Sequence, residues 1–260
     1  MYSLINGSAY DFGYAREWTH GHLVPAAVFA AICFLAWRRH WPRWIIIAMA
    51  AGTAWAVAGF CIVQWTLIPS APLTLPTPRF LESGGVASQV LDIGAGSGRA
   101  TLMVLLARPQ ARVTALDRFA AGYGIEGNTP DRLTANVRAA GAAERLTVQT
   151  GDARQMPLPS NSFDGAVSSY VIDHLGREGA QRALVETYRV LRPKGEFLLM
   201  VINRDRWIAF AYPFLHGHGY FGQMPARTYW INGLTAAGFE IVEDGTVPGT
   251  LYVLARKKGE

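Results

Sequence analysis

The sequence is poor in charge and in cysteine. Charged residues make up 17% of the 260 residues and hydrophobic residues 50%, a low charged share for a soluble protein. Cys33 and Cys61 are the only cysteines, and both lie within apolar runs. Two such cysteines argue against a disulfide framework, a thiol nucleophile and a cysteine metal site.

The chain also lacks runs of basic residues and low-complexity segments. The formal net charge of +5 is spread out, without the Lys/Arg clusters of nucleic-acid-binding arms, so we expect no nucleic-acid partner. Residues 1–75 contain only four basic and two acidic side chains. The apolar bias therefore lies in this N-terminal quarter, and the modest positive charge suits attraction to anionic membrane lipid.

Residues 1–22 mix aromatic and polar side chains, and they lack the charged leader and cleavage-site pattern of a secretory signal. We expect an interfacial segment or a short helix here, with a loosely ordered tail as the alternative.

Two apolar runs predict a membrane hairpin over residues 23–68. Residues 23–37 form an uncharged run of fifteen, and residues 44–68 form a run of twenty-five. About 20 apolar residues cross the hydrocarbon core of a bilayer, so the first run needs a snorkelling Arg38 to span it. Small residues at four-residue spacing, such as Ala48 and Gly52, favour close packing and a homo-oligomer through the hairpin.

Residues 69–78 contain four prolines and predict a stiff linker to the domain formed by residues 79–260. After the linker, apolar strand patterns alternate with helical ones. Strands are expected at 89–93, 112–117, 146–150, 163–168, 195–201, 239–244 and 250–256, and helices at 99–108, 130–140, 177–191 and 227–237. This alternation predicts an α/β fold with a seven-stranded, doubly wound, mainly parallel sheet after two apolar membrane helices.

A glycine-rich turn follows the first expected strand. Gly94, Gly96 and Gly98 bring backbone N–H groups to the end of a parallel strand, where a nucleotide-like cofactor can approach. A dinucleotide fingerprint would require a further glycine at the position of Arg99, which argues against a dinucleotide-dependent reductase. The next strand ends in Asp117, whose carboxylate can accept from both hydroxyls of a ribose.

This pattern and three later segments, 146–153, 158–169 and 189–197, resemble the class I S-adenosylmethionine-dependent methyltransferases. The four motifs occur in the family's order over roughly residues 80–258. The resemblance implies a Rossmann-like fold, S-adenosylmethionine as cofactor, and an antiparallel last strand at the sheet edge.

The resemblance also implies roles for individual residues. Asp92 would order the glycine turn and face the methionine ammonium, Asp117 would bind the ribose, and Asp152 would bind the adenine amino group. The predicted cofactor-binding residues are Asp92, Gly94, Gly96, Gly98, Asp117, Arg118, Asp152, Ala153 and Ser168.

The acceptor side is expected after the fourth strand, where Tyr170, Asp173 and His174 are the candidate catalytic residues. Imidazole titrates near neutrality, so His174 suits a general base, although a packing role is equally compatible with its position.

An aromatic insertion at residues 202–227 predicts a lid over the acceptor, and residues 123–125 are expected to form the opposite wall. His216 and His218 lack a third ligand of suitable spacing, so no metal site is predicted.

These observations predict a membrane-anchored methyltransferase that acts on a small or lipophilic acceptor at the bilayer surface. The alternative is a non-catalytic, membrane-tethered cofactor-binding or assembly module. The positive-inside rule would place the basic loop at residues 38–43 in the cytoplasm, and the domain outside. Because S-adenosylmethionine is an intracellular cofactor, we expect the catalytic domain on the cytoplasmic side.

Overall fold

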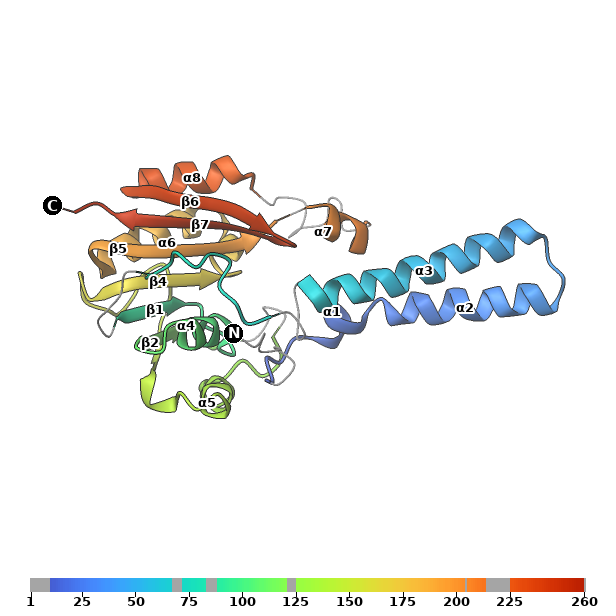
Figure 1. The fold of residues 1–260 in the computed structure, drawn as a ribbon, viewed down its shortest axis with the longest axis horizontal. Helices are drawn as coiled ribbons and strands as arrows, with labels where there is room; N and C mark the ends of the chain where they lie inside the picture. Colours follow the sequence, from blue (N-terminus) through green and yellow to red (C-terminus); the bar gives the residue numbers. More distant parts are fainter. Residues whose placement is uncertain are drawn as a thin grey trace.

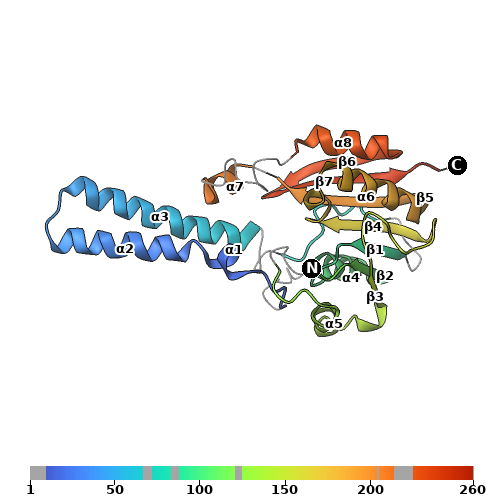
Figure 2. The same cartoon turned by 180° about the vertical axis from the view of Figure 1, so that it is seen from behind.

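The computed structural model describes residues 10–66, 72–82, 88–120, 125–203, 205–213 and 225–259. They form an α/β domain and a two-helix hairpin that projects from one end of it (Figure 1). The view from behind shows the same elongated arrangement, with the C-terminal end at the opposite end of the domain from the hairpin (Figure 2).

The domain is built on a seven-stranded sheet. Its strands are β1 (Gln89–Ile93), β2 (Arg112–Asp117), β3 (Leu146–Thr150), β4 (Phe163–Ser169), β5 (Leu191–Ile202), β6 (Phe239–Val247) and β7 (Thr250–Lys257). Their order in the sheet is β3-β2-β1-β4-β5-β7-β6. Strands β1 to β5 pair in parallel, and β7 is antiparallel to both of its neighbours. The predicted seven-stranded, mainly parallel sheet is confirmed.

One detail of the predicted topology is wrong, since the last strand does not form the sheet edge. A two-residue turn at Pro248 and Gly249 folds β7 back on β6, and the other side of β7 pairs with β5. Gly249 has a φ of +77°, a conformation that glycine adopts without strain. Strand β6 is therefore the edge.

Helices cover both faces of the sheet: α4 (Arg99–Ala107), α5 (Pro130–Ala139), α6 (Gly176–Val190) and α8 (Arg227–Ala236). Successive strand residues point to opposite faces. Leu91 and Ile93 pack in the same core cluster as Leu184 of α6, whereas Val90 packs with Leu102 of α4. The doubly wound arrangement thus places the β1 to α4 turn at one end of the sheet.

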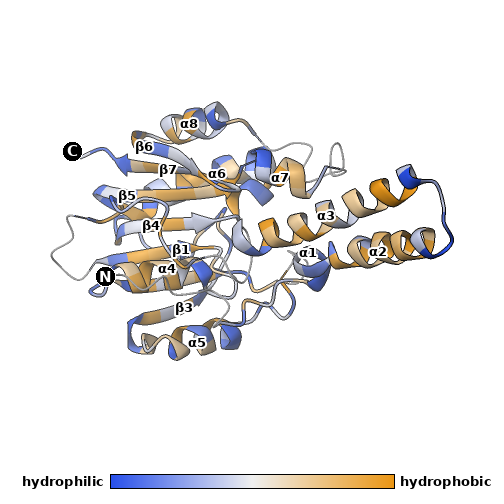
Figure 3. Ribbon diagram, turned by 45° about the vertical axis from the view of Figure 1, so that its right-hand side comes forward, coloured by the Kyte–Doolittle hydropathy of each residue, from blue (hydrophilic) through white to orange (hydrophobic). Residues whose placement is uncertain are grey.

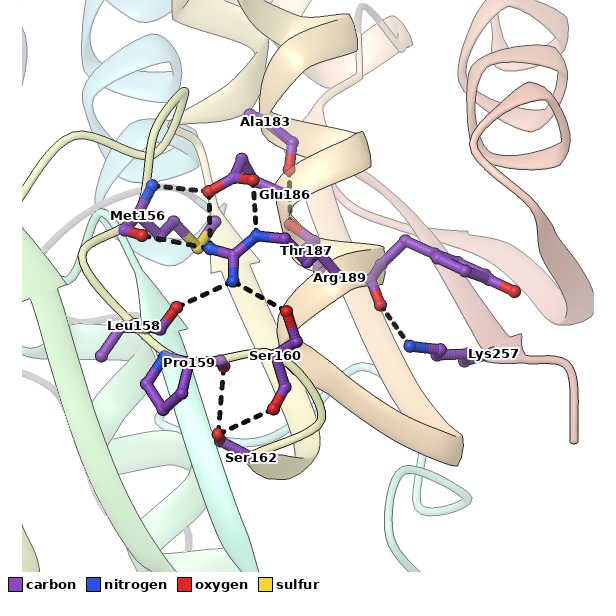
Figure 4. Close-up of polar contacts among 11 residues, drawn as sticks. Met156, Leu158, Pro159, Ser160, Ser162, Ala183, Glu186, Thr187, Arg189 and Lys257 are labelled. Carbon is purple, nitrogen blue, oxygen red and sulfur yellow. Dashed lines mark hydrogen bonds and ion pairs between the residues drawn. The ribbon is translucent and has the colours of Figure 1, made fainter. Parts of the chain in front are cut away.

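Arg189 of α6 fixes the loop between β3 and β4 (Figure 4). Its guanidinium donates to the carbonyls of Met156, at 3.1 Å, and Leu158, at 2.8 Å. Glu186 accepts from the Met156 amide at 2.7 Å, and its hydrogen bond with Arg189 lowers the pKa of the Glu186 carboxyl. Two of the motifs that carry the resemblance therefore meet in one polar network, which holds the chain that follows Asp152.

The hairpin consists of α2 (Leu23–Arg38) and α3 (Arg43–Thr66), preceded by the short α1 (Arg16–His20). A Cβ atom on Gly52 would lie 2.9 Å from the Phe29 ring, so the glycine permits close packing of the two helices. Hydrophobic residues run along both helices, and a hydrophilic loop joins them at the far tip (Figure 3).

Among the described helices, only α3 is long and apolar enough to cross a membrane, by length and composition. Helix α2 has 16 residues, fewer than the approximately 20 that a span requires.

A further short helix, α7 (Arg206–Ala211), attaches the hairpin to the domain. His22 at the start of α2 lies 2.6 Å, through Nε2, from the Ala211 carbonyl, and Trp55 of α3 donates to the Phe210 carbonyl at 3.0 Å. The predicted lid therefore contributes α7 as a contact to the hairpin. Residues 204 and 214–224 of that segment, including His216 and His218, lie outside the described residues.

The described part of the predicted linker, residues 72–78, and the residues that follow it pack against the domain. Leu73, Thr77 and Phe80 are buried against the domain. Arg108 donates through Nε to the Phe80 carbonyl at 2.9 Å. Leu73 and Phe80 thus pack this segment against the α4 face of the sheet.

Candidate active site

The glycine turn after β1 is tied to the end of β2. Gly94, Gly96 and Gly98 have φ values of +75°, +54° and +91°, which explains the repeated glycine. The amides of Gly94 and Ala95 donate to the Leu116 carbonyl at 2.7 and 3.0 Å. The backbone of the turn is thereby fixed next to the carboxyl ends of both strands.

Asp117 closes this region by holding three donors. Its Oδ2 accepts from the Gly96 amide at 2.9 Å, and its Oδ1 accepts from the Phe119 amide at 2.6 Å and from Asn128 Nδ2 at 3.2 Å. A carboxylate offers about four acceptor positions, so capacity remains for a hydroxyl donor. The predicted ribose-binding residue faces the site.

A cavity of about 200 Å³ lies above these strand ends. Many of the predicted site residues line it, namely Gly94, Gly96, Asp117, Arg118, Asp152, Ala153, Tyr170 and His174. Ile125 of the expected opposite wall lines it too, while residues 123 and 124 are outside the described residues. The predicted residues that do not line it are Asp92, Gly98, Ser168 and Asp173.

Asp92 lies beneath the turn. It is fully buried, and its Oδ2 accepts from Thr101 Oγ1 of α4 at 2.5 Å. Burial raises the pKa of Asp92 to about 7, despite the opposing effect of the Thr101 hydrogen bond. Asp92 thus orders the turn by joining β1 to α4, and the structure does not show it facing the cavity.

Ser168 and Asp173 have structural contacts. The hydroxyl of Ser168 donates to the Ile93 carbonyl at 3.1 Å, which joins β4 to β1, and the neighbouring Ser169 lines the cavity instead. Asp173 accepts from the Ile202 amide at 3.2 Å, and burial raises the pKa of its carboxyl to about 6. Neither side chain lines the cavity, and their predicted ligand contacts stay predictions.

Asp152 is bound by its own loop. Arg154 donates to both carboxylate oxygens, and Arg118 lies 3.9 Å from Oδ2. The hydrogen bonds from Arg154 lower the pKa of Asp152 to about 2. The carboxylate is therefore ionised at neutral pH and remains an acceptor at the edge of the cavity.

Tyr170 and His174, which follow β4, also line the cavity. Tyr170 has a φ of +55°, an uncommon conformation for a tyrosine, and its hydroxyl hydrogen-bonds Thr250 Oγ1. Burial raises the pKa of Tyr170 to about 12 and lowers that of His174 to about 4. At neutral pH the tyrosine keeps its proton, and the imidazole is neutral.

The N-terminal strap, residues 10–15, is the part of the site that the sequence did not reveal. Phe12 and Tyr14 line the cavity, and Phe12 is only 3% exposed. The buried Asn136 accepts from the Asp11 amide at 3.0 Å, and its Nδ2 donates to the Asp11 carbonyl at 2.7 Å and to the Ser97 carbonyl at 2.9 Å. One side chain thus fastens the strap to the glycine turn.

A second cavity of about 280 Å³ adjoins the first. Arg99, Ser169 and Tyr170 line both cavities. The second cavity extends to Trp65 and Thr66 at the end of α3. The site therefore has two compartments, one at the glycine turn and one next to the hairpin.

The first compartment fits S-adenosylmethionine. Asn128 lines it with a buried Oδ1 that has no hydrogen-bond partner among the described residues. Such an oxygen is an acceptor for a hydroxyl or amino donor of a ligand. With the glycine turn and Asp117, this donor and acceptor set suits a nucleoside.

Comparison with known proteins supports this assignment. Residues 91–199 match the family model for a methyltransferase domain. The chain is 35% identical over 113 residues to a ubiquinone/menaquinone biosynthesis C-methyltransferase UbiE of Methylobacterium nodulans, covering 43% of this chain and 41% of that protein. It is 29% identical over 125 residues to a demethylmenaquinone methyltransferase of Symbiobacterium thermophilum, covering 47% of each.

Among solved structures, the fold resembles the Burkholderia thailandensis 1,6-didemethyltoxoflavin-N1-methyltransferase with bound 1,6-didemethyltoxoflavin and S-adenosylhomocysteine. The TM-score is 0.50 at 24% identity, over 69% of this chain and 75% of that chain. The family model and the curated relative support the predicted class, an S-adenosylmethionine-dependent methyltransferase, and its cofactor, and the solved structure supports the fold. The chain spans less than half of the length of the two curated relatives.

Proposed function

We propose that the protein is a membrane-anchored methyltransferase that transfers a methyl group from S-adenosylmethionine to a small or lipophilic acceptor at the bilayer surface. The observation that carries this proposal is the pair of adjoining cavities, one at the glycine turn and the other at the end of α3. The first holds the cofactor, and the second holds the acceptor.

S-adenosylmethionine supplies a methyl group on a sulfonium, and the chain's task is to bind, align and exclude water. In the proposed complex, Asp117 binds the ribose. Asp152 and the Ala153 amide receive the adenine beside Arg118. Their positions around the first cavity support these roles.

His174 is a side chain of the site that can take up a proton, and it follows closely after Tyr170, which lines both cavities. It lines the first cavity and is neutral at physiological pH, with a pKa lowered to about 4 by burial. An imidazole with this pKa is a weak base, so it serves acceptors whose proton is readily lost. We assign it as the general base, with Tyr170 as a wall of the site.

The membrane anchor is the hairpin 23–68, and the catalytic unit comprises residues 79–260 together with the strap. Helix α3 has the length and hydropathy of a spanning helix, and both ends of the hairpin return to the domain. A lipophilic acceptor agrees with this anchor and with the quinone-related names of the curated relatives. We propose a cytoplasmic catalytic domain in contact with membrane lipid, and self-association through the hairpin remains a prediction.

The test uses the full chain in lipid vesicles with methyl-labelled S-adenosylmethionine and a membrane extract. Label should enter the lipid-soluble fraction. His174→Gln should lower the rate about 100-fold, with the affinity for S-adenosylhomocysteine unchanged. Cofactor binding without any labelled product would contradict the enzymatic role and favour a non-catalytic module.

A further inference from the structure

Arg99 lies between the two cavities. It is the first residue of α4, directly after the glycine turn, and it lines both compartments. Its guanidinium lies over the ring of Phe12 in the strap, 5.3 Å from the ring centroid. The strap and the helix therefore position a cation at the passage from the cofactor side to the acceptor side.

The surroundings of this cation in the second cavity are mostly apolar. The described lining includes Trp65, Leu75, Met103 and Met200, and Arg99 is its only charged residue. A charge next to apolar walls strongly favours an opposite charge within hydrogen-bond distance. The planar guanidinium is suited to an anionic oxygen, which it binds with paired N–H donors.

The charge of Arg99 also affects Tyr170, a residue that lines the second cavity. Tyr170 hydrogen-bonds Thr250, which lines the second cavity and not the first. Burial raises the pKa of Tyr170, and the positive charge of Arg99 partly opposes that increase. The guanidinium therefore acts toward the compartment in which an acceptor would lie.

We infer that the second cavity binds its acceptor as an oxyanion, a phenol-type molecule whose ionised hydroxyl contacts Arg99 and whose apolar body extends toward Trp65 and Met200. This inference rests on the proposed function and names its substrate class. The hydroxyl proton passes to His174, the proposed general base, and from there to solvent, so the acceptor is an electron-rich nucleophile before methyl transfer. Arg99 then determines specificity, because a neutral acceptor of the same shape would not gain the charge-assisted hydrogen bond to its guanidinium.

The first experiment uses 4-nitrophenol as the probe, because its ionised form absorbs visible light. The full chain in detergent, with and without S-adenosylhomocysteine, is titrated with pH in the presence of the probe. The bound probe should have an apparent pKa at least one unit below that of free 4-nitrophenol, a tenfold or greater preference for the anion. Nitrobenzene, a neutral analogue, should bind more weakly.

Variants assign the effect to Arg99. Arg99→Gln should abolish the shift and weaken probe binding at least tenfold, and Arg99→Lys should retain part of both. Arg182→Gln, which removes an exposed arginine paired with Glu178 on α6, should behave as the wild type. A bound probe with an unshifted pKa, or an equal shift in a folded Arg99→Gln protein, overturns the inference.

A second arm separates the acceptor from the cofactor's own carboxylate, the other anion within reach of this site. Affinities for S-adenosylhomocysteine and for 5′-methylthioadenosine, which lacks that carboxylate, are measured in wild type and Arg99→Gln. A tenfold loss confined to S-adenosylhomocysteine, with unchanged probe binding, overturns the inference and leaves the proposed function intact. Wild-type protein that binds neither nucleoside contradicts the proposed function, while the probe titration still decides the role of Arg99.

Discussion

Replacing Asn136 by alanine should open the N-terminal strap without unfolding the domain. The substitution removes two hydrogen bonds to the backbone of Asp11 and one to the Ser97 carbonyl. Each hydrogen bond contributes about 0.5–1.5 kcal/mol, and water can satisfy the exposed Asp11 groups, so we expect the strap's opening free energy to fall by about 1–3 kcal/mol. The bond to the buried Ser97 carbonyl lies within the domain, so its loss lowers the stability of the domain and leaves the strap's opening free energy unchanged.

Hydrogen exchange measures that opening directly. The Glu126 amide donates to the Gly13 carbonyl of the strap at 2.7 Å, so its protection reports closure. Exchange at Glu126 should accelerate about 5- to 150-fold in Asn136→Ala, since 1.4 kcal/mol corresponds to a factor of ten. Amides in β5 and β7 should exchange as in the wild type. The affinity for S-adenosylhomocysteine should fall by up to the same factor, because Phe12 and Tyr14 line the cavity.

Gln149→Ala, which removes a half-buried side chain on β3 whose amide bonds only the neighbouring Thr150 carbonyl among the described residues, serves as the control. A folded Asn136→Ala protein whose Glu126 amide exchanges within twofold of the wild-type rate would refute the claim that Asn136 fastens the strap to the glycine turn.

Three further changes test the domain and the hairpin. Burial raises the pKa of Asp92 to about 7, so the folded state keeps a proton that the unfolded state releases near pH 4. The stability of the wild type should therefore fall as the pH rises from 4 to 7. Asp92→Asn should flatten this pH dependence in thermal unfolding. Gly52→Leu should disrupt the α2–α3 packing, because overpacking costs about 1–3 kcal/mol, and it should therefore lower the melting temperature of the hairpin. Ala51→Leu, on the exposed face of α3, should leave the melting temperature unchanged. Arg189→Gln removes the bonds to the loop after β3 and should lower the free energy of unfolding by about 2–4 kcal/mol in urea, with Arg182→Gln as the neutral control.

The part of the site made by local sequence was predictable. A buried strand, alternating glycines and a helix specify the turn between β1 and α4, and the end of β2 specifies the position of Asp117. Both features follow from local strand, turn and helix signals, and the parallel sheet brings the ends of the two strands to the same edge. The bounds of most strands and helices followed for the same reason.

The remaining features depend on distant contacts. The aromatic and polar side chains of residues 1–22 predicted an interfacial segment or a short helix, and they do not identify Asn136, more than a hundred residues away, as the partner of the strap. Ser168 and Ser169 are consecutive on β4 and point to opposite faces of the sheet, and the local composition does not indicate which of the two lines the cavity. The prolines of the linker predicted an extended spacer. The position of residues 72–80 on the domain depends on the burial of Leu73 and Phe80, which the local sequence does not reveal.

Calorimetric titration of S-adenosylhomocysteine into the full chain and its Asp117→Ala variant tests the central claim, that the hollow above β1 and β2 binds the cofactor. The account predicts one molecule per chain and an affinity at least tenfold lower in Asp117→Ala, since a hydrogen bond to a charged group contributes about 1.5–3 kcal/mol. Asp131→Ala, an exposed acid on α5, should bind as the wild type. Absence of binding to the wild type, or equal affinity in a folded Asp117→Ala protein, would contradict the claim.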